Sequence, residues 1–182
     1  MKRIGVPLLL LITTIVFSSC SFAPQEATGD RRPAAFPDMR LEQTRYVLGM
    51  EGASPIRIEA QTIELYREAG EAYIDNATFT QDDTAGVLLF SGSFGNAVVD
   101  TETNDVVMTG GVEIRNHRDD FTLSAVSLAW NHGGKTMAGD SDTLVTIVSK
   151  EHDILRGTGF RGEFSTATFE FMYLEEGRLT YD

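Results

Sequence analysis

The sequence predicts an all-β protein, built as a sandwich, a jelly roll or a barrel. Apolar and polar residues alternate with a period of two along much of the chain, turn-forming residues interrupt this alternation at short intervals, and a weak repeat recurs after 32 to 33 residues. A half-buried sheet requires such alternation, because successive side chains of a strand point to opposite faces. Short strands at regular spacing are typical of these three architectures.

The N-terminus has the three parts of a bacterial export signal. Lys2 and Arg3 form a positive region, residues 4–17 are mostly apolar and uncharged, and two serines precede Cys20. The apolar stretch is shorter than the roughly 20 residues that a spanning helix needs. The small residues before Cys20 resemble a lipobox, which predicts a lipoprotein signal peptide over residues 1–19 and acylation of Cys20. The alternative is an uncleaved signal anchor.

The segment after the signal has the composition of a tether. Residues 20–44 carry three prolines, a glycine and charges of both signs, and such a composition favours an extended linker. We therefore expect the folded domain to begin near residue 45 and to include the rest of the chain, 45–182.

The body of the chain reads as strands separated by turns. Alternation is clear in 56–60, 106–115, 122–125, 145–148 and 164–171. Turn-forming residues lie between such runs at 82–83, 101–104, 116–120, 131–134 and 150–153. The segment 60–70 is compatible with a helix, but the alternation of 56–58 runs straight into it, so we expect a strand there. The segment 172–182 is compatible with either a last strand or a loose tail.

The weak repeat indicates stacked units. Residues 109–114 are echoed by 142–147, Leu123 and Ala125 by Leu155 and Gly157, and 135–137 by 167–169. Units of a few strands cannot bury an apolar face alone, so they stack and share a continuous interior.

Composition and charge bound the function. The chain is 42% hydrophobic and 23% charged, which is enough apolar material for a core, and its net charge of −12 becomes −14 once Lys2 and Arg3 are removed with the signal. A surface this acidic repels phosphates, so we exclude binding to nucleic acid. With a single cysteine the chain has no internal disulfide framework.

Several segments, taken in order, resemble the LptC/OstA-like family of lipopolysaccharide-transport proteins. They are Ile58-Glu59-Ala60 to Tyr66, Val106-Val107-Met108-Thr109-Gly110-Gly111-Val112-Glu113-Ile114, Leu123-Ser124-Ala125 with Leu128 and Trp130, Lys135-Thr136 with Gly139, and Leu155-Arg156-Gly157 with Gly159-Phe160. The resemblance covers about residues 47–171, and its specificity comes from the order and spacing of the segments together.

The resemblance implies an elongated, open β-jelly roll of stacked antiparallel strands, sometimes called a β-taco. It implies a lipid-anchored periplasmic component of outer-membrane biogenesis, with the inner membrane favoured for the anchor. Such a component receives lipopolysaccharide or a related glycolipid from an inner-membrane ABC transporter. It passes the lipid to an LptA-like periplasmic bridge protein that joins it sheet edge to sheet edge. The competing hypothesis is a structural or adaptor β-sandwich lipoprotein with a closed core.

Ten apolar residues are expected to face the interior and, on the resemblance, to bind lipid. They are Ile58, Phe79, Met108, Ile114, Leu123, Leu128, Trp130, Ile147, Leu155 and Phe164. The same residues would form the core of an ordinary sandwich. Four glycines within strand patterns are expected at bulges or close backbone approaches, and on the resemblance at strand bends or a partner's docking site. They are Gly110, Gly111, Gly157 and Gly159.

The polar residues suggest no chemistry. His117, His132 and His152 lie in expected turns, 15 and 20 residues apart and without a nearby cysteine, whereas metal sites need several ligands at set spacings. A hydrolase or sugar-binding domain lacks a plausible histidine or carboxylate constellation. We therefore expect a protein that is not an enzyme and has no metal and no cofactor.

Overall fold

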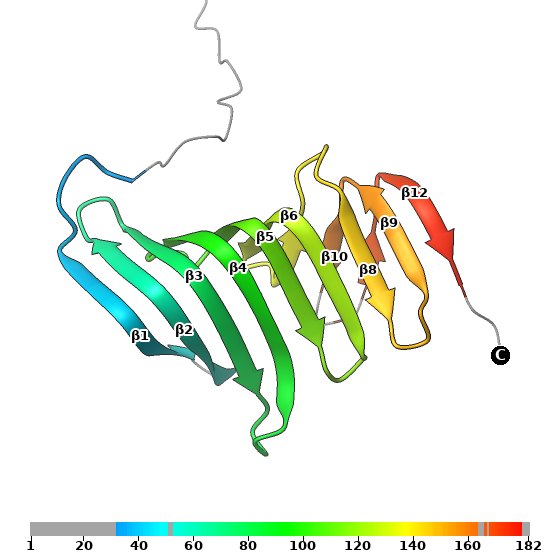
Figure 1. The fold of residues 1–182 in the computed structure, drawn as a ribbon, viewed down its shortest axis with the longest axis horizontal. Coiled ribbons are helices and arrows are strands. Elements are labelled where there is room, and N and C mark those ends of the chain that lie inside the picture. Colours follow the sequence, from blue (N-terminus) through cyan, green and yellow to red (C-terminus); the bar gives the residue numbers. More distant parts are fainter. Residues whose placement is uncertain (1–31, 51–52, 164–165, 167, 180–182) are drawn as a thin grey trace, which may run out of the picture. The chain divides into compact units, whose positions relative to one another are not determined.

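The computed structural model describes residues 32–50, 53–163, 166 and 168–179, and all of the helical or extended structure within them is β-strand. The prediction of an all-β fold is thus confirmed (Figure 1). The strands are β1 (Met39–Met50), β2 (Ala53–Tyr66), β3 (Glu71–Asp82), β4 (Leu88–Asp100), β5 (Val106–Asn116), β6 (Phe121–Asn131), β7 (Thr136–Ala138), β8 (Val145–Ser149), β9 (Ile154–Thr158), β10 (Arg161–Glu163), β11 (Thr168–Glu170) and β12 (Tyr173–Arg178).

The strands form one antiparallel sheet that does not close on itself. Its path follows the chain from β1 to β6, each strand pairing with the next. At β6 the sheet divides: one branch continues through β7, β10 and β11, and the other through β8, β9 and β12. Figure 1 shows the second branch extending the sheet at the C-terminal end, with β10 behind β8.

Long strands change the facing of their side chains near the middle. In β2, both Ala60 and Ile63 belong to the buried core, and in β4 both Phe94 and Ala97 do. A regular strand places residues three apart on opposite faces, so each of these strands is irregular between the two positions. Asn76 of β3 lies at the same level of the sheet and has a left-handed backbone, with a φ of 45°.

These irregularities lie on one line that crosses the sheet, which we call the fold line. Positive φ values mark it at Gln43, Asn76, Gly110 and Gly111. Shifts of register mark it between β4 and β5 and between β5 and β6. Bulges and bends of this kind let one strand belong to two packed layers. Residues from both sides of the line share one core cluster, so the two halves of the sheet face each other.

We call these halves the first leaf and the second leaf. The first leaf comprises residues 44–50, 53–60, 77–82, 88–94, 112–116 and 121–125 with β8, β9 and β12. The second leaf comprises residues 39–42, 62–66, 71–75, 96–100, 106–109 and 127–131 with β7, β10 and β11.

The short strands follow the same arrangement, with the two leaf portions of each long strand replaced by two separate short strands. β8 pairs with residues 121–125 of β6 and β7 with residues 129–131, so they are the two leaf portions of one interrupted strand. Gly159 and Phe160 alone separate β9 from β10, and two residues separate β11 from β12. Gly159 has a φ of 63°, as expected for a residue at the fold line. The result is an open β-jelly roll, in agreement with the predicted architecture.

The sequence repeat has a structural counterpart on the first leaf. Val112 and Val145, which are 33 residues apart, both pair with Ala125 of β6, one from each side. Ile114 and Ile147 likewise flank Leu123. The repeat therefore marks equivalent interior positions on strands related by two steps of the sheet.

The structure also refines three expectations about segment boundaries. β1 begins at Met39, inside the segment 20–44 that we expected to be tether, because Leu41 packs on the core and Gln43 interrupts the alternation that would have revealed a strand. The segment 60–70 is strand as far as Tyr66, as expected, followed by a turn. The C-terminal segment forms β12, which pairs with β9.

Candidate functional site

An apolar groove lies between the two leaves, along strands β1 to β7. Its volume is about 210 Å³. The first leaf contributes Leu48, Ile56, Ile58, Phe79, Phe90 and Ile114. The second leaf contributes Ile74, Val99, Val106, Met108, Trp130 and Met137. Both leaves line the groove, so it exists because the sheet folds along the fold line and brings the two leaves face to face.

Polar groups are scarce in the groove. Within the described part of the chain, Gln81 and Asn104 are the only residues with polar amide side chains that line it, and they come from opposite leaf margins. The amide nitrogen of Gln81 donates to the backbone oxygen of Ser54 over 2.9 Å, so this group is already engaged in the sheet. A surface of this kind can bury an acyl chain but offers little to a polar molecule.

Interior side chains differ in exposure along the sheet. Ile58 and Phe79 are only half-buried, whereas Leu123 and Val145 are 0% exposed. Phenylalanine rings cluster in the interior near β9 to β11. Phe169 lies 5.1 Å from Phe121 and 6.1 Å from Phe160, measured between ring centroids. We call Phe121, Phe160, Phe169 and Phe171 the aromatic plug, since the last of these also contacts Phe160, at 5.4 Å.

Half of the ten predicted interior residues line the groove. They are Ile58, Phe79, Met108, Ile114 and Trp130. Four others lie in or against the core outside the groove: Leu123, Leu128, Ile147 and Leu155. Phe164 is outside the described residues. All nine described positions pack on the core as expected for interior residues, while their contact with lipid stays a prediction.

Several groove residues were not singled out by the sequence. Ile74, Val99 and Met137 belong to this group. Each lies on the second leaf, where the fold line has shifted the alternation relative to the first leaf. Ile74 and Phe79 are an odd number of residues apart, yet both line the groove. A period-two pattern assigns them to opposite faces, and only an allowance for a bend at Asn76 would have joined them.

The four predicted glycines occupy special backbone positions. Gly110 and Gly111 have φ values of 79° and 85° and coincide with register shifts on both sides of β5. Gly157 lies so close to the backbone of Tyr173 that a Cβ atom would overlap its carbonyl oxygen. Gly159 has a left-handed backbone next to the fold line. Bends and close approaches thus occur at these glycines, and docking of a partner there stays a prediction.

The segment that enters β1 crosses the outer face of the second leaf. Ile63 belongs to the core, so its neighbour Glu64 points to the outer face, where Arg32 contacts it. We call residues 32–38 the strap. Their last residue, Asp38, donates its backbone N–H to the carbonyl oxygen of Leu65 (2.8 Å) and accepts the N–H of Arg67 on its carboxylate (2.7 Å).

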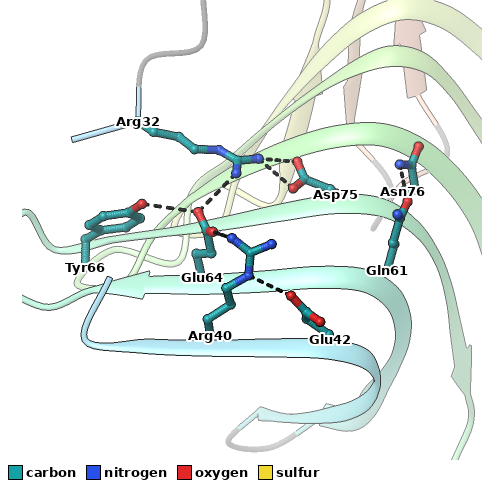
Figure 2. A network of polar contacts seen from close by, with 8 residues as sticks. All are labelled: Arg32, Arg40, Glu42, Gln61, Glu64, Tyr66, Asp75 and Asn76. Carbon is teal, nitrogen blue, oxygen red and sulfur yellow. Dashed lines mark hydrogen bonds and ion pairs between the residues drawn. The ribbon is translucent and has the colours of Figure 1, made fainter. Parts of the chain in front are cut away.

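Figure 2 shows the ion-pair network beneath the strap. Arg32 donates to Glu64 over 3.1 Å and to both oxygens of Asp75, at 2.6 and 2.5 Å. Its guanidinium also lies 5.8 Å from the ring centroid of Tyr73. From β1, Arg40 donates to the second oxygen of Glu64 over 2.8 Å. The hydroxyl of Tyr66 donates to Glu64 as well, at 3.1 Å, so three side chains converge on one carboxylate.

Two further polar contacts involve a turn and the outer face of the sheet. The backbone N–H groups of Thr103 and Glu102 donate to Asp100 and hold the pKa of its carboxyl below its ordinary value. Nε2 of His117 lies 2.8 Å from the hydroxyl of Ser91 on the outer face. No group of histidine, cysteine or acidic side chains in the described residues is arranged to hold a metal ion.

The predicted signal and Cys20 lie outside the described residues. In the portion that the structure describes, no helix has the length and apolarity to cross a membrane.

No protein-family model matches the sequence, and no curated protein is significantly similar to it.

Proposed function

We propose that this protein carries a lipid in the periplasm, holding an acyl chain of lipopolysaccharide or a related glycolipid between its two leaves. In this proposal it is lipid-anchored through Cys20, receives the lipid from an inner-membrane ABC transporter and hands it to an LptA-like bridge protein. The observation that carries the proposal is the apolar groove along β1 to β7. No chemical step is required, because burial of apolar surface alone stabilises the bound chain, at about 25 cal/mol per Å².

The size of the groove supports a chain rather than a whole lipid. An apolar cavity of about 150 Å³ is enough to bind benzene, and the groove holds about 210 Å³. Pockets for complete drug-sized ligands are larger, roughly 300–1,000 Å³. The groove therefore suits part of one acyl chain, with the rest of the lipid outside.

The free edges of the sheet support the proposed hand-over. β1 stands at one end of the described sheet, and β11 and β12 end its two branches. On β12, Tyr173 and Leu174 are 66% and 56% exposed. An unpaired edge offers a row of backbone groups to which another sheet can add a strand.

One observation favours the competing function, an adaptor with a closed core. The aromatic plug fills the interior at the β8–β11 end, where Phe160 is 1% exposed. If the groove closed in the same way in solution, the domain would be an ordinary sandwich that binds partners only through its surface.

Photo-crosslinking in intact cells tests the proposal. A photoreactive phenylalanine analogue replaces Phe79 or Trp130 in the groove, and matched controls carry it at Thr78 or Ala129, the adjacent residues that are exposed on the opposite face. We expect a crosslink to a glycolipid from the two groove positions and none from the two controls. A folded, abundant protein without any lipid crosslink would favour the adaptor.

A further inference from the structure

Two arginines from different elements hold the same buried carboxylate. Arg32 belongs to the strap and Arg40 to β1, and each donates to one oxygen of Glu64. The Glu64 side chain is only 4% exposed. Removing one partner of a buried ion pair leaves a poorly solvated charge, which costs far more than losing a pair at the surface.

The network spans three strands. Asp75 of β3 binds Arg32 with both carboxylate oxygens, while Glu64 of β2 binds both arginines. The strap is therefore fastened across β2 and β3, and Arg40 fastens β1 to the same point. An arginine suits this role, because its planar guanidinium can bind one carboxylate with two nitrogen atoms or bridge two carboxylates.

The network matters because β1, which it joins to β2, is an edge strand that lines the groove. The only strand partner of β1 among the described residues is β2. β1 supplies Leu48 to the wall of the groove, and its Leu41 packs on the core. Edge elements open before the centre of a sheet, so the contacts that hold β1 on β2 govern how readily the groove widens at that edge.

We propose that the strap is a latch on the lipid groove, with Arg32 and Glu64 as its positioning residues. When Arg32 is seated, β1 is held against β2 and the groove keeps its outer wall. When the strap leaves, Glu64 loses one of its two cations, β1 loosens and the groove opens at that edge. The gating role rests on the proposed lipid binding, whereas the holding of β1 against β2 does not.

Hydrogen exchange on the full chain tests the latch. We expect Arg32→Ala to speed exchange of the β1 amide protons by about tenfold or more, since it breaks a buried pair, and to leave β6 and β8 unchanged. Arg45→Ala is the matched control: Arg45 joins β1 directly to β2, through Glu59, but both side chains are largely exposed, at 84% and 60%. We expect about threefold or less from it. Equal exchange of β1 in the two variants would overturn the latch.

A double-mutant cycle separates the latch from a general loosening. If Arg32 acts through Glu64, the combination Arg32→Ala with Glu64→Gln speeds exchange of β1 by clearly less than the product of the two single effects. Effects that simply multiply would mean that the two residues stabilise β1 independently, and the latch would fail.

Lipid crosslinking from position 79 in cells supplies the functional readout. We expect Arg32→Ala to change the yield of the lipid adduct by severalfold, and Arg45→Ala to leave it unaltered. An unchanged yield in the first variant, with faster exchange of β1, would overturn the gating role. Absence of any adduct in the unmodified protein would instead reject the proposed function, while the exchange data would still decide whether the strap holds β1.

Discussion

At the scale of single residues, the ring of Phe79 reaches the groove because its cross-strand neighbour is a glycine. Phe79 pairs with Gly92, and a Cβ atom at position 92 would lie 2.5 Å from Cε1 of that ring and equally close to the carbonyl oxygen of Glu113. Any larger residue would push the ring away or distort the strand. The neighbouring Phe94 packs at 6.4 Å from Phe79, so a displaced ring would meet a second aromatic wall.

The Asp100 turn gives a residue-scale prediction about pH. Backbone N–H groups, first that of Thr103 and then that of Glu102, favour the ionised carboxylate and lower its pKa from the ordinary value of 3.8. Because the pKa is lowered on folding, this group stabilises the fold above the unfolded pKa and loses that contribution as the pH falls through the folded value. We expect the side-chain carbonyl resonance of Asp100 to titrate with a midpoint below 3.8.

The variant Thr103→Pro supplies the control for this titration. It removes the N–H group with the largest effect on Asp100, so the midpoint should rise toward 3.8. A midpoint at or above 3.8 in the unmodified protein would contradict the proposed role of the turn.

At the scale of elements, the aromatic plug decides how the two leaves hold together. Phe121 comes from the first leaf and Phe169 from the second, and their rings meet edge to face at an interplanar angle of 78°. Such contacts add to the burial of the rings themselves. The plug therefore joins the leaves where β7 to β12 are too short to hold them through long pairing.

Truncation of Phe160 tests this element. The residue is 1% exposed and contacts two other rings. We expect Phe160→Ala to lower the free energy of unfolding by about 3–5 kcal/mol, the usual cost of such a cavity, measured by chemical denaturation. Phe36→Ala is the control, because Phe36 is 98% exposed, and it should change stability little. A loss below about 1 kcal/mol would show that the leaves do not depend on the plug.

The sequence predicts most of the strands correctly, but it does not predict where the sheet bends. Period-two alternation and turn residues located most of the strands, because sheet burial dictates both. The fold line escaped this reasoning, since Gln43 and Asn76 adopt positive φ without any glycine to announce it. Five of the proposed lipid contacts line the groove, because the alternation that predicts interior side chains also places these residues on the inner face of the sheet. The strap could not be foreseen, because Arg32 meets Glu64 and Asp75 across more than thirty residues of chain.

At the scale of the whole described domain, stability should be graded along the sheet. Ile58 of β2 and Phe79 of β3 are interior side chains that stay partly exposed, whereas Leu123 of β6 and Val145 of β8 are 0% exposed. Local opening is easiest where few apolar contacts are buried. The groove end is therefore the less stable part of one continuous sheet.

This gradient predicts the pattern of native-state hydrogen exchange. Amide protons of β6 and β8 should exchange only through global unfolding, and those of β1 should exchange through local opening, with a lower free energy. The dependence of each rate on denaturant distinguishes the two routes. If all strands share one free energy of exchange, the domain opens as a single unit and the graded sheet is refuted.

The aromatic plug at one end of the interior has a consequence for how a bound lipid would enter and leave. A groove that is open at both ends can accept a lipid at one end while it releases another at the other end, and several lipids can occupy it at once. If the protein carries a lipid as proposed and the aromatic plug blocks one end of the interior, a lipid tail would leave through the same opening by which it entered. The donor and the acceptor protein would then bind at the same opening, one after the other. Lipids would be transferred one at a time, at a rate limited by the exchange of donor for acceptor.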